Sequence, residues 1–389
     1  MKYIDEFRDG AVAKQLAQKI AREARPERSY RLMEFCGGHT HSLWRYGIVQ
    51  MLPPSVEMIH GPGCPVCVLP IGRLEQAIEL ARRPGVTLCT FGDMMRVPAR
   101  DRKSLQKAKA EGADVRMVYG SGDALRFAQQ HPEREVVFFA IGFETTTPAT
   151  AVVVKQAAEL GVSNFSVFCN HVLTPSAIEA ILGSPDAKEG RIRVDGFVGP
   201  GHVSTIIGTA PYERFAREHG KPVVVSGFEP LDLMQSILML VRQLNDGRAE
   251  VENEYARAVT RDGNAKAIAL TAEVLELRPT FSWRGLGTLS DSALRVRERY
   301  AAWDAERKWN IPYEHVADHK ACACGEILRG LKQPSDCKIF GTACTPESPI
   351  GSCMVSPEGS CAAYYSYGRL RRTATGSRVG AGVPEDVEV

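Results

Sequence analysis

The sequence predicts an α/β protein with two βαβ-type domains, built on mainly parallel sheets, followed by a helical and irregular cysteine-rich domain. Three observations support this prediction. Short apolar runs alternate with amphipathic segments from about residue 31 to residue 228, as in chains that form parallel sheets. Beyond residue 228, helical periodicity replaces the strand pattern. The last fifth of the chain then holds six cysteines in a segment that has no periodicity.

Eight apolar runs in the first part of the chain each end in Gly, His, Thr or Pro. Continuous apolar runs are typical of parallel strands that are buried on both faces. The helical segments at residues 72–82, 105–112 and 149–160 fit the right-handed crossovers of βαβ units. The runs are RLMEF, VEMIH, VTLCT, VRMVY, VVFFAI, FSVF, DGFV and PVVV. Eight units exceed one small sheet, so we expect two α/β domains, at residues 1–131 and 132–228.

The remainder of the chain is predicted to be helical and then irregular. Residues 230–244 and 264–277 have helical periodicity, and residues 291–308 read as a charged amphipathic helix. We therefore expect a third domain over residues 229–370, in which metal–ligand bonds supply the order of the cysteine-rich part. Residues 371–389 are rich in Gly, Ser and charge and are predicted to form a disordered tail.

The composition is that of a cytoplasmic protein with metal or redox chemistry. The 389 residues carry 48 basic and 46 acidic side chains, so the net charge of +2 gives no reason to expect a nucleic acid or an anionic membrane as partner. No apolar stretch approaches the ~20 residues that span a bilayer, and the acidic N-terminus is unlike a signal peptide. Eleven cysteines in a reducing compartment favour metal binding or thiol chemistry over structural disulfides.

Two cysteine loops follow the first two predicted strands. Cys36 begins the loop CGGHTH, which also holds His39 and His41, and Cys64 and Cys67 belong to CPVC. If the two strands are neighbours, three thiols and two imidazoles gather at one edge of a sheet. We expect the dipole of the following helix to lower the pKa of the Cys36 thiol.

The chemistry of this group is open to more than one interpretation. A C-x-x-C at the junction of a strand and a helix suits either a dithiol/disulfide couple or two metal ligands. The three thiols can also form a metal site, Cys36, Cys64 and Cys67, and a structural zinc site with one added His is the simplest version.

The C-terminal thiols favour an iron–sulfur cluster. Their spacing matches neither the compact bacterial ferredoxin run nor paired zinc knuckles. Six thiols supply four cluster ligands and leave two that can act as a redox pair. The six are Cys322, Cys324, Cys337, Cys344, Cys353 and Cys361.

Three motifs, in this order, resemble those of the HypD family of hydrogenase maturation factors. They are EFCGGHTH at residues 34–41, HGPGCPVC at residues 60–67, and the segment from residue 318 to residue 367 that contains CACGEILRG, CTPESP and GSCMVSPEGSC. The resemblance extends over nearly the whole chain, from about residue 4 to residue 370, and implies two α/β domains plus a domain with a [4Fe–4S] cluster.

The resemblance implies a scaffold on which the Fe(CN)2CO unit of [NiFe]-hydrogenases is assembled, rather than a conventional turnover enzyme. Iron(II) would be held between Cys36 and a cysteine of a small chaperone of the HypC type. Cyanide would arrive from a partner of the HypE type. His39 and His41 would orient the iron or its ligands, while Cys64 and Cys67 would share the iron or supply electrons.

The cluster surroundings are similar to those of the catalytic subunit of ferredoxin:thioredoxin reductase. That likeness implies Cys322, Cys337, Cys344 and Cys361 as cluster ligands, and Cys324 with Cys353 as the redox pair. Electrons would pass from this pair to Cys64 and Cys67 by thiol–disulfide exchange, which requires the two ends of the chain to meet.

Two other functions are compatible with the residues alone. One is a stand-alone [4Fe–4S] thiol–disulfide oxidoreductase with no iron cargo. The other is a zinc-stapled interaction module without redox chemistry. Metal analysis that finds zinc and no iron would favour the zinc-stapled module. Reduction of a generic disulfide without a partner protein would favour the oxidoreductase.

Overall fold

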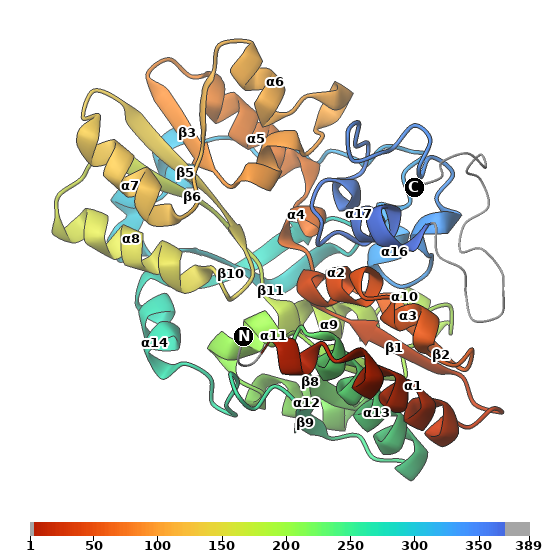
Figure 1. The fold of residues 1–389 in the computed structure, drawn as a ribbon. Coiled ribbons are helices and arrows are strands. Elements are labelled where there is room, and N and C mark those ends of the chain that lie inside the picture. The colour runs from red at the N-terminus through yellow and green to blue at the C-terminus, as the bar shows by residue number, and fades with distance from the viewer. Residues whose placement is uncertain (1–3, 370–389) are drawn as a thin grey trace.

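The computed structural model describes residues 4–369 and contains two parallel α/β sheets, a β-hairpin and a C-terminal cysteine-rich segment. In Figure 1 the two sheets lie one above the other, and the C-terminal segment, in blue, lies at one side of the molecule near α2 (Gly37–Arg45) and α4 (Pro65–Val68). The α/β class predicted from the sequence is confirmed. Among the described residues, no helix is both long and apolar enough to cross a bilayer.

The first sheet has five strands in the order β2-β1-β7-β8-β9, all parallel. Its strands are β1 (Tyr30–Glu34), β2 (Val56–His60), β7 (Gly196–Gly199), β8 (Val223–Val225) and β9 (Val251–Asn253). Successive side chains point to opposite faces, so Leu32 packs under α1 (Gly10–Glu23) and α13 (Pro230–Asp246), while Met33 joins the core on the other face. Burial on both faces explains why these strands are continuously apolar.

The second sheet has four parallel strands in the order β4-β3-β5-β6. They are β3 (Val86–Thr90), β4 (Asp114–Met117), β5 (Glu135–Gly142) and β6 (Phe165–His171). The side chains of α5 and α6 pack on one face, and those of α7 and α8 pack on the other. All eight strands predicted from the sequence are therefore present.

The distribution of strands between the sheets differs from the predicted division of the chain. A boundary at residue 131 would place β3 and β4 with β1 and β2, yet β3 pairs with β5 and β4. The chain instead leaves the first sheet after β2, completes the whole second sheet, and returns to the first sheet at β7, which pairs with β1. Neither predicted segment, 1–131 or 132–228, corresponds to one sheet.

The helices cover the sheets and the C-terminal segment. The α-helices are α1 (Gly10–Glu23), α2 (Gly37–Arg45), α3 (Ile48–Met51), α4 (Pro65–Val68), α5 (Ile71–Arg82), α6 (Leu105–Ala110), α7 (Ser121–Gln130), α8 (Thr147–Glu159), α9 (Thr174–Leu182), α10 (Pro185–Lys188), α11 (Gly201–Ile207), α12 (Ala210–His219), α13 (Pro230–Asp246), α14 (Ala265–Val274), α15 (Ala305–Trp309), α16 (Cys324–Leu328) and α17 (Ser360–Ala363). Short 3-10 turns include η2 (Gly92–Arg96), η4 (Glu298–Trp303) and η6 (Ser352–Met354), and the π-helical turn η7 (Tyr364–Gly368) follows α17.

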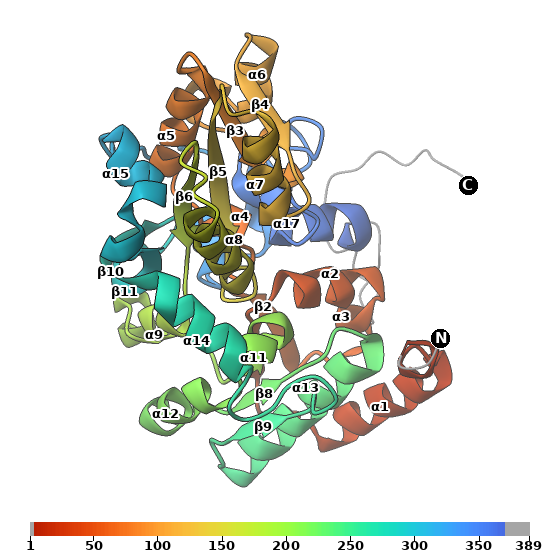
Figure 2. The same ribbon diagram turned by 90° about the vertical axis from the view of Figure 1, so that its left-hand side faces the viewer.

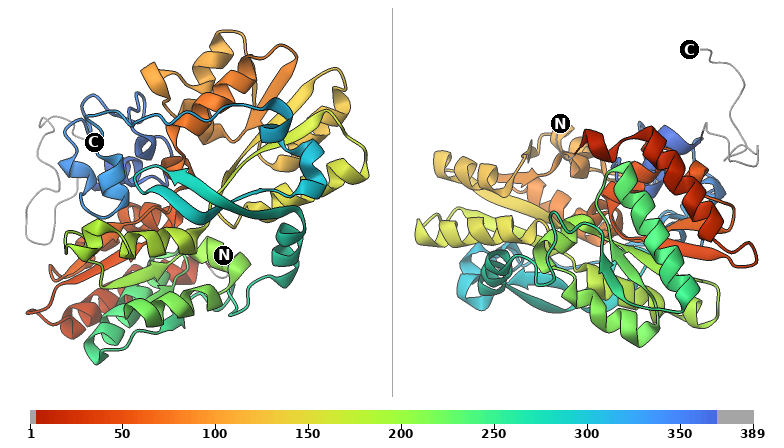
Figure 3. Two further views of the ribbon diagram at one scale, coloured as in Figure 1. Left: turned by 180° about the vertical axis from the view of Figure 1, so that it is seen from behind. Right: turned by 60° about the horizontal axis from the view of Figure 1, so that its bottom comes forward.

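A β-hairpin takes the place of parts of two helices predicted after residue 228. The helix at 230–244 is present as α13, but the predicted helix 264–277 ends at Val274 in α14, and 291–308 begins as a strand. The strands β10 (Leu275–Trp283) and β11 (Gly287–Val296) pair in antiparallel fashion. Seen from behind, the hairpin crosses between the two sheets (Figure 3). Pairing within the hairpin overrides the helical propensity of Leu, Ala, Glu and Arg in the overlapping residues 275–277 and 291–296.

The cysteine-rich segment is irregular, as predicted, and packs between the first sheet and the loops of the second. Figure 2 shows α17 directly above α2, and the first sheet lies below them. The predicted tail, 371–389, lies outside the described residues.

Candidate functional site

The loops that carry Cys36 and Cys64 lie side by side because β1 and β2 are adjacent parallel strands. Glu34 at the end of β1 is in register with His60 at the end of β2. Just beyond the strands, the Gly37 amide donates a hydrogen bond of 2.9 Å to the carbonyl of Gly63. A Cβ on Gly63 would lie 2.5 Å from the Cys36 nitrogen, so only glycine permits this close approach of the two loops. The predicted gathering of thiols at one sheet edge is present.

A cavity of about 450 Å³ opens beside these loops, between the carboxyl ends of the two sheets. The first sheet contributes the loops after β1, β2 and β7, and the second contributes those after β3, β4 and β5. Ligands bind at such strand ends in open α/β sheets. The principal lining residues are Cys36, Cys64, Asp93, Tyr119, Phe143, Thr146, His202 and Glu358.

Cys36 is the N-cap residue of α2 and is only 6% exposed. Its sulfur lies 3.8 Å from Nδ1 of His202. Burial raises the pKa of the Cys36 thiol to about 12, and the nearby carboxylate of Glu358 raises it further. The expectation that the helix dipole lowers this pKa is therefore wrong, because desolvation of the thiolate outweighs the dipole at this buried position. With this pKa, Cys36 is a neutral thiol at neutral pH.

The two imidazoles of the CGGHTH loop do not line the cavity. His39 is completely buried behind the loop, where Nε2 lies 3.1 Å from the carbonyl of Ser226, and burial lowers its pKa to about 4. His41 packs edge-on against Tyr367, 5.2 Å away between ring centroids. From these positions His39 supports the loop from within, and His41 contacts the C-terminal segment.

Two other polar residues reach Cys36 from distant parts of the chain. His202 lies in α11, stacks on Phe228 at 3.9 Å, and has a pKa lowered by burial. Glu358 follows η6 in the C-terminal segment, and burial together with the charges of Asp93 and Glu34 raises its pKa. The sequence reasoning gave His202 no particular role and did not consider Glu358. The GPGH turn before His202 repeats the strand–Gly–His pattern of the first loop and was the available signal.

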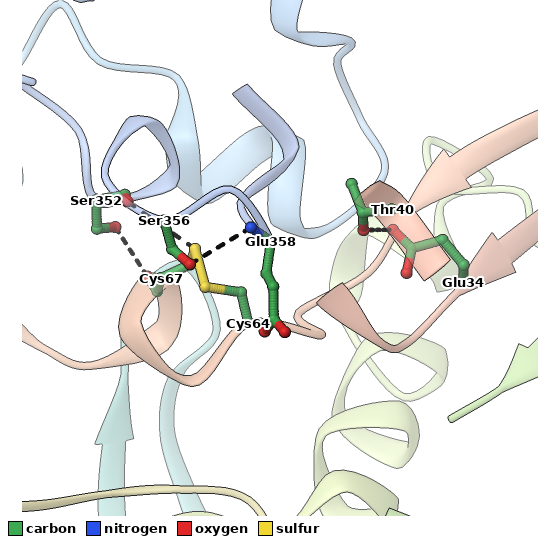
Figure 4. The surroundings of a disulfide bond; sticks show 7 residues. All are labelled: Glu34, Thr40, Cys64, Cys67, Ser352, Ser356 and Glu358. Carbon is green, nitrogen blue, oxygen red and sulfur yellow. Dashed lines mark hydrogen bonds between the residues drawn. A yellow bond between two sulfur atoms is a disulfide. The ribbon is translucent and has the colours of Figure 1, made fainter. Parts of the chain in front are cut away.

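The CPVC loop joins the cavity to the C-terminal thiols. Cys64 and Cys67 form a disulfide. In Figure 4 the yellow Cys64–Cys67 disulfide is drawn with the Glu358 side chain on one side and Ser352 of η6 on the other. Cys64 lines the cavity, whereas the sulfur of Cys67 lies 4.0 Å from the Ser352 carbonyl, and the Ser352 hydroxyl donates to the carbonyl of Cys67 at 3.0 Å. The approach of the two chain ends that the predicted electron route requires is present.

The C-terminal cysteines form a second group of sulfur atoms. Cys324 hydrogen-bonds to both Cys322 and Cys361 through sulfur. Gly351 has no room for a Cβ, which would lie 2.5 Å and 2.6 Å from the Cys324 and Cys322 sulfurs. The Ile350 amide donates to the sulfur of Cys344 at 3.3 Å. Cys322 is partly exposed, and the other five cysteines of the group are buried.

This donor set fits a cysteine-ligated cluster. The contact with Cys324 and burial raise the pKa of Cys322 and of Cys361, and burial raises that of Cys344. Several buried thiols become thiolates only when a positive centre compensates their charge. Within residues 4–369, no three Cys, His, Asp or Glu side chains converge as ligands of one metal ion. The ligand sulfurs of a cubane are spread more widely, because each binds a different iron.

Comparisons with known proteins place the chain in a family over nearly its whole length. The family model described as "HypD: Hydrogenase formation hypA family" matches residues 11–368. The hydrogenase maturation factor HypD of Azotobacter vinelandii is 64% identical over 96% of this chain and 98% of its own length. The factors of the same name from Cupriavidus necator and Escherichia coli are 62% and 44% identical over 95% and 94% of this chain, and 98% of their own lengths. The chain belongs to the HypD family of hydrogenase maturation factors.

Proposed function

We propose that the chain is the scaffold on which the Fe(CN)2CO unit of [NiFe]-hydrogenases is assembled, together with partners of the HypC and HypE types. One observation carries the proposal. The CPVC loop presents Cys64 to the cavity beside Cys36, and it presents Cys67 to the segment that holds the C-terminal thiols. The Cys64–Cys67 disulfide therefore connects the cavity, where we propose that the iron binds, with the C-terminal thiols, which we propose supply electrons.

Cys36 binds the Fe(II) substrate as a thiolate, with the second protein ligand supplied by the HypC-type partner. Because the free thiol is protonated at neutral pH, metal binding releases its proton. His202 and Glu358 are the nearest groups able to accept that proton. Apolar walls from Phe35, Phe91 and Phe143 exclude water from the iron and its cyanide and carbonyl ligands.

The resident cluster would be held by Cys322, Cys337, Cys344 and Cys361, and it would supply single electrons. The Cys353 thiolate attacks the sulfur of Cys67, forms a mixed disulfide, and releases the Cys64 thiolate toward the cavity. Cys324 then attacks Cys353, which forms a Cys324–Cys353 disulfide and frees Cys67 as a thiolate. Two electrons have moved from the C-terminal pair to the CPVC pair, and no outside oxidant is needed.

The test is anaerobic purification of the complex with the HypC-type partner, followed by infrared spectroscopy and metal analysis. Wild-type chain should show the cyanide and carbonyl stretching bands, and Cys36→Ser should lose them. Cys89→Ser is the matched control, because Cys89 is completely buried in β3 away from the cavity. Bands that persist in Cys36→Ser would reject the assignment of the iron to this thiol.

The contact between the disulfide and the C-terminal segment also suits the second candidate, a stand-alone thiol–disulfide oxidoreductase. Reduction of a generic disulfide by the free chain, abolished in Cys67→Ser, together with absence of iron–cyanide bands from the complex, would select that function. A metal content of zinc without iron would select the zinc-stapled interaction module instead.

A further inference from the structure

A completely buried carboxylate lies directly behind the Cys36 loop. Glu34, the last residue of β1, accepts a hydrogen bond of 3.0 Å from the backbone amide of Cys36 through Oε2. Its other oxygen, Oε1, accepts from the hydroxyl of Thr40 and from Nδ1 of His60 at 2.9 Å. Figure 4 shows the contact between Glu34 and Thr40. A buried carboxylate that accepts three hydrogen bonds fixes the groups that donate them.

Trp44 sets the hydrogen-bonding state of His60. The indole Nε1–H of Trp44 donates to Nε2 of His60 over 3.4 Å. An indole nitrogen can only donate, so Nε2 of His60 must accept, and the ring hydrogen lies on Nδ1, facing Glu34. The hydrogen bonds therefore run in one direction, from Trp44 through His60 to Glu34.

The geometry of β1, β2 and α2 brings these groups together. Glu34 and His60 are register partners on adjacent strands. Cys36, Thr40 and Trp44 are spaced by four residues, which places them along one face of α2. Trp44 in turn packs edge-on against Tyr364 of the C-terminal segment, with ring centroids 4.8 Å apart.

We propose that Trp44, His60 and Glu34 form a hydrogen-bonded relay that holds the backbone of Cys36 in place. Glu34 and His60 are positioning residues of the site, and Trp44 fixes the hydrogen on His60 that the relay requires. The inference rests on the proposed role of Cys36 as the iron ligand. The relay extends the site to residues that contact the backbone of Cys36 or support that contact, and that do not themselves bind the iron.

The substitution Glu34→Gln exposes the direction of the relay. If the amide oxygen of Gln accepts from Cys36, its NH2 group faces His60, whose hydrogen must move to Nε2 and meet the Trp44 N–H. If the amide is reversed, its NH2 group meets the Cys36 N–H instead. Each orientation sets two donors against each other in a buried site, where an unpaired donor costs about 1–3 kcal/mol. Adding Trp44→Phe removes the opposing indole donor, so the first orientation keeps one unpaired hydrogen on Nε2 of His60 in place of two donors set against each other.

The experiment measures the alkylation rate of Cys36 by iodoacetamide in the full-length free chain, with peptide mass mapping to resolve each thiol. Because Cys36 is almost fully buried, its reaction depends on local opening of the loop. Glu34→Gln should speed the reaction about tenfold. Trp44→Phe alone should change it less than about threefold, and Glu34→Gln with Trp44→Phe should react about threefold more slowly than Glu34→Gln alone. Loss of charge at Glu34 is the same in the single and double variants, so only the relay predicts rescue.

A second pair of variants keeps the Glu34 charge in place and tests the relay if Glu34→Gln does not fold. In His60→Asn the amide nitrogen can occupy the position of Nδ1 and still donate to Glu34. In His60→Gln the amide reaches the position of Nε2 and leaves Glu34 without this donor. Cys36 should react several-fold faster in His60→Gln than in His60→Asn, with equal thermal unfolding midpoints.

Equal rates in the two His60 variants, or a double variant as fast as Glu34→Gln, would overturn the relay. The readout needs no iron, so it separates the relay from the proposed function. If the relay fails while Cys36→Ser loses the infrared bands, the iron assignment stands. If rescue occurs but Cys36→Ser keeps the bands, the relay positions a thiol with another role.

Discussion

Gly63→Ala should disturb the junction between the two cysteine loops more than any other change of similar size. A Cβ there would lie 2.5 Å from the Cys36 nitrogen, 2.6 Å from the Phe35 carbonyl carbon and 2.9 Å from the Cys36 Cα. All three are backbone atoms, so no side chain can rotate away. The loops must separate by about 0.9 Å to reach the 3.4 Å of ordinary contact. Overpacking of this kind costs about 1–3 kcal/mol of unfolding free energy.

Urea denaturation measures the global cost, and hydrogen exchange of residues 36–45 measures the local one. The Gly37 amide, bonded to the Gly63 carbonyl, should exchange faster in Gly63→Ala. Gly122→Ala is the matched control, since nothing lies within 4 Å of its Cβ and it occupies the first turn of α7, where alanine is favoured by about 0.5–1 kcal/mol. If Gly63→Ala resembles Gly122→Ala in both assays, the loops are not held in rigid contact.

Three further outcomes are expected. Arg73→Ala should lower the unfolding free energy in urea by about 1–3 kcal/mol, because it leaves the buried side-chain oxygen of Asn170 without its donor, while Glu306 keeps its pair with Arg278; a loss below about 1 kcal/mol would contradict this. Since burial and then Glu358 raise the Cys36 pKa to about 12, the ultraviolet absorbance of the Cys36 thiolate, taken as the difference between wild type and Cys36→Ser, should not appear between about pH 7 and pH 9; a thiolate that forms in this range would show a lower pKa. Gly351→Ala should reduce iron per chain after anaerobic purification, because its Cβ would occupy the space of two C-terminal sulfurs; unchanged iron would place the cluster elsewhere.

The strands could be predicted from the sequence because burial on both faces leaves a local record, a continuous apolar run. Which strands share a sheet leaves no such record. β1 pairs with β7, which lies more than 150 residues later, and β3 to β6 are inserted between β2 and β7. The hairpin of β10 and β11 was missed for a different reason: the predicted helices extended into its two outer ends, residues 275–277 and 291–296, where Leu, Glu, Ala and Arg favour helix and strand pairing decides the structure.

Only the part of the thiol site whose residues follow consecutive strands in the sequence could be predicted. Cys36 and Cys64 follow consecutive strands, and consecutive parallel strands often pair, so their proximity followed from the pattern. His202 and Glu358 approach Cys36 through β7 and the C-terminal segment. The GPGH turn marks His202 as a candidate, but its sequence does not predict the contact with Cys36, and no motif marks Glu358. The lowered Cys36 pKa expected from its N-cap position was wrong because the depth of burial depends on the second sheet, which the loop's own sequence does not describe.

That burial bears on the choice between the proposed functions. A thiol that acts as a free nucleophile or redox group is normally activated by a lowered pKa in a positively charged environment. Cys36 instead lies in an apolar cavity beside the carboxyl of Glu358, and its pKa is raised. Such a site disfavours the bare thiolate, and a divalent cation that enters it is attracted by the carboxylate and stabilises the thiolate it binds. The environment of Cys36 therefore favours an iron-binding scaffold over a stand-alone oxidoreductase in which this thiol would carry the redox chemistry.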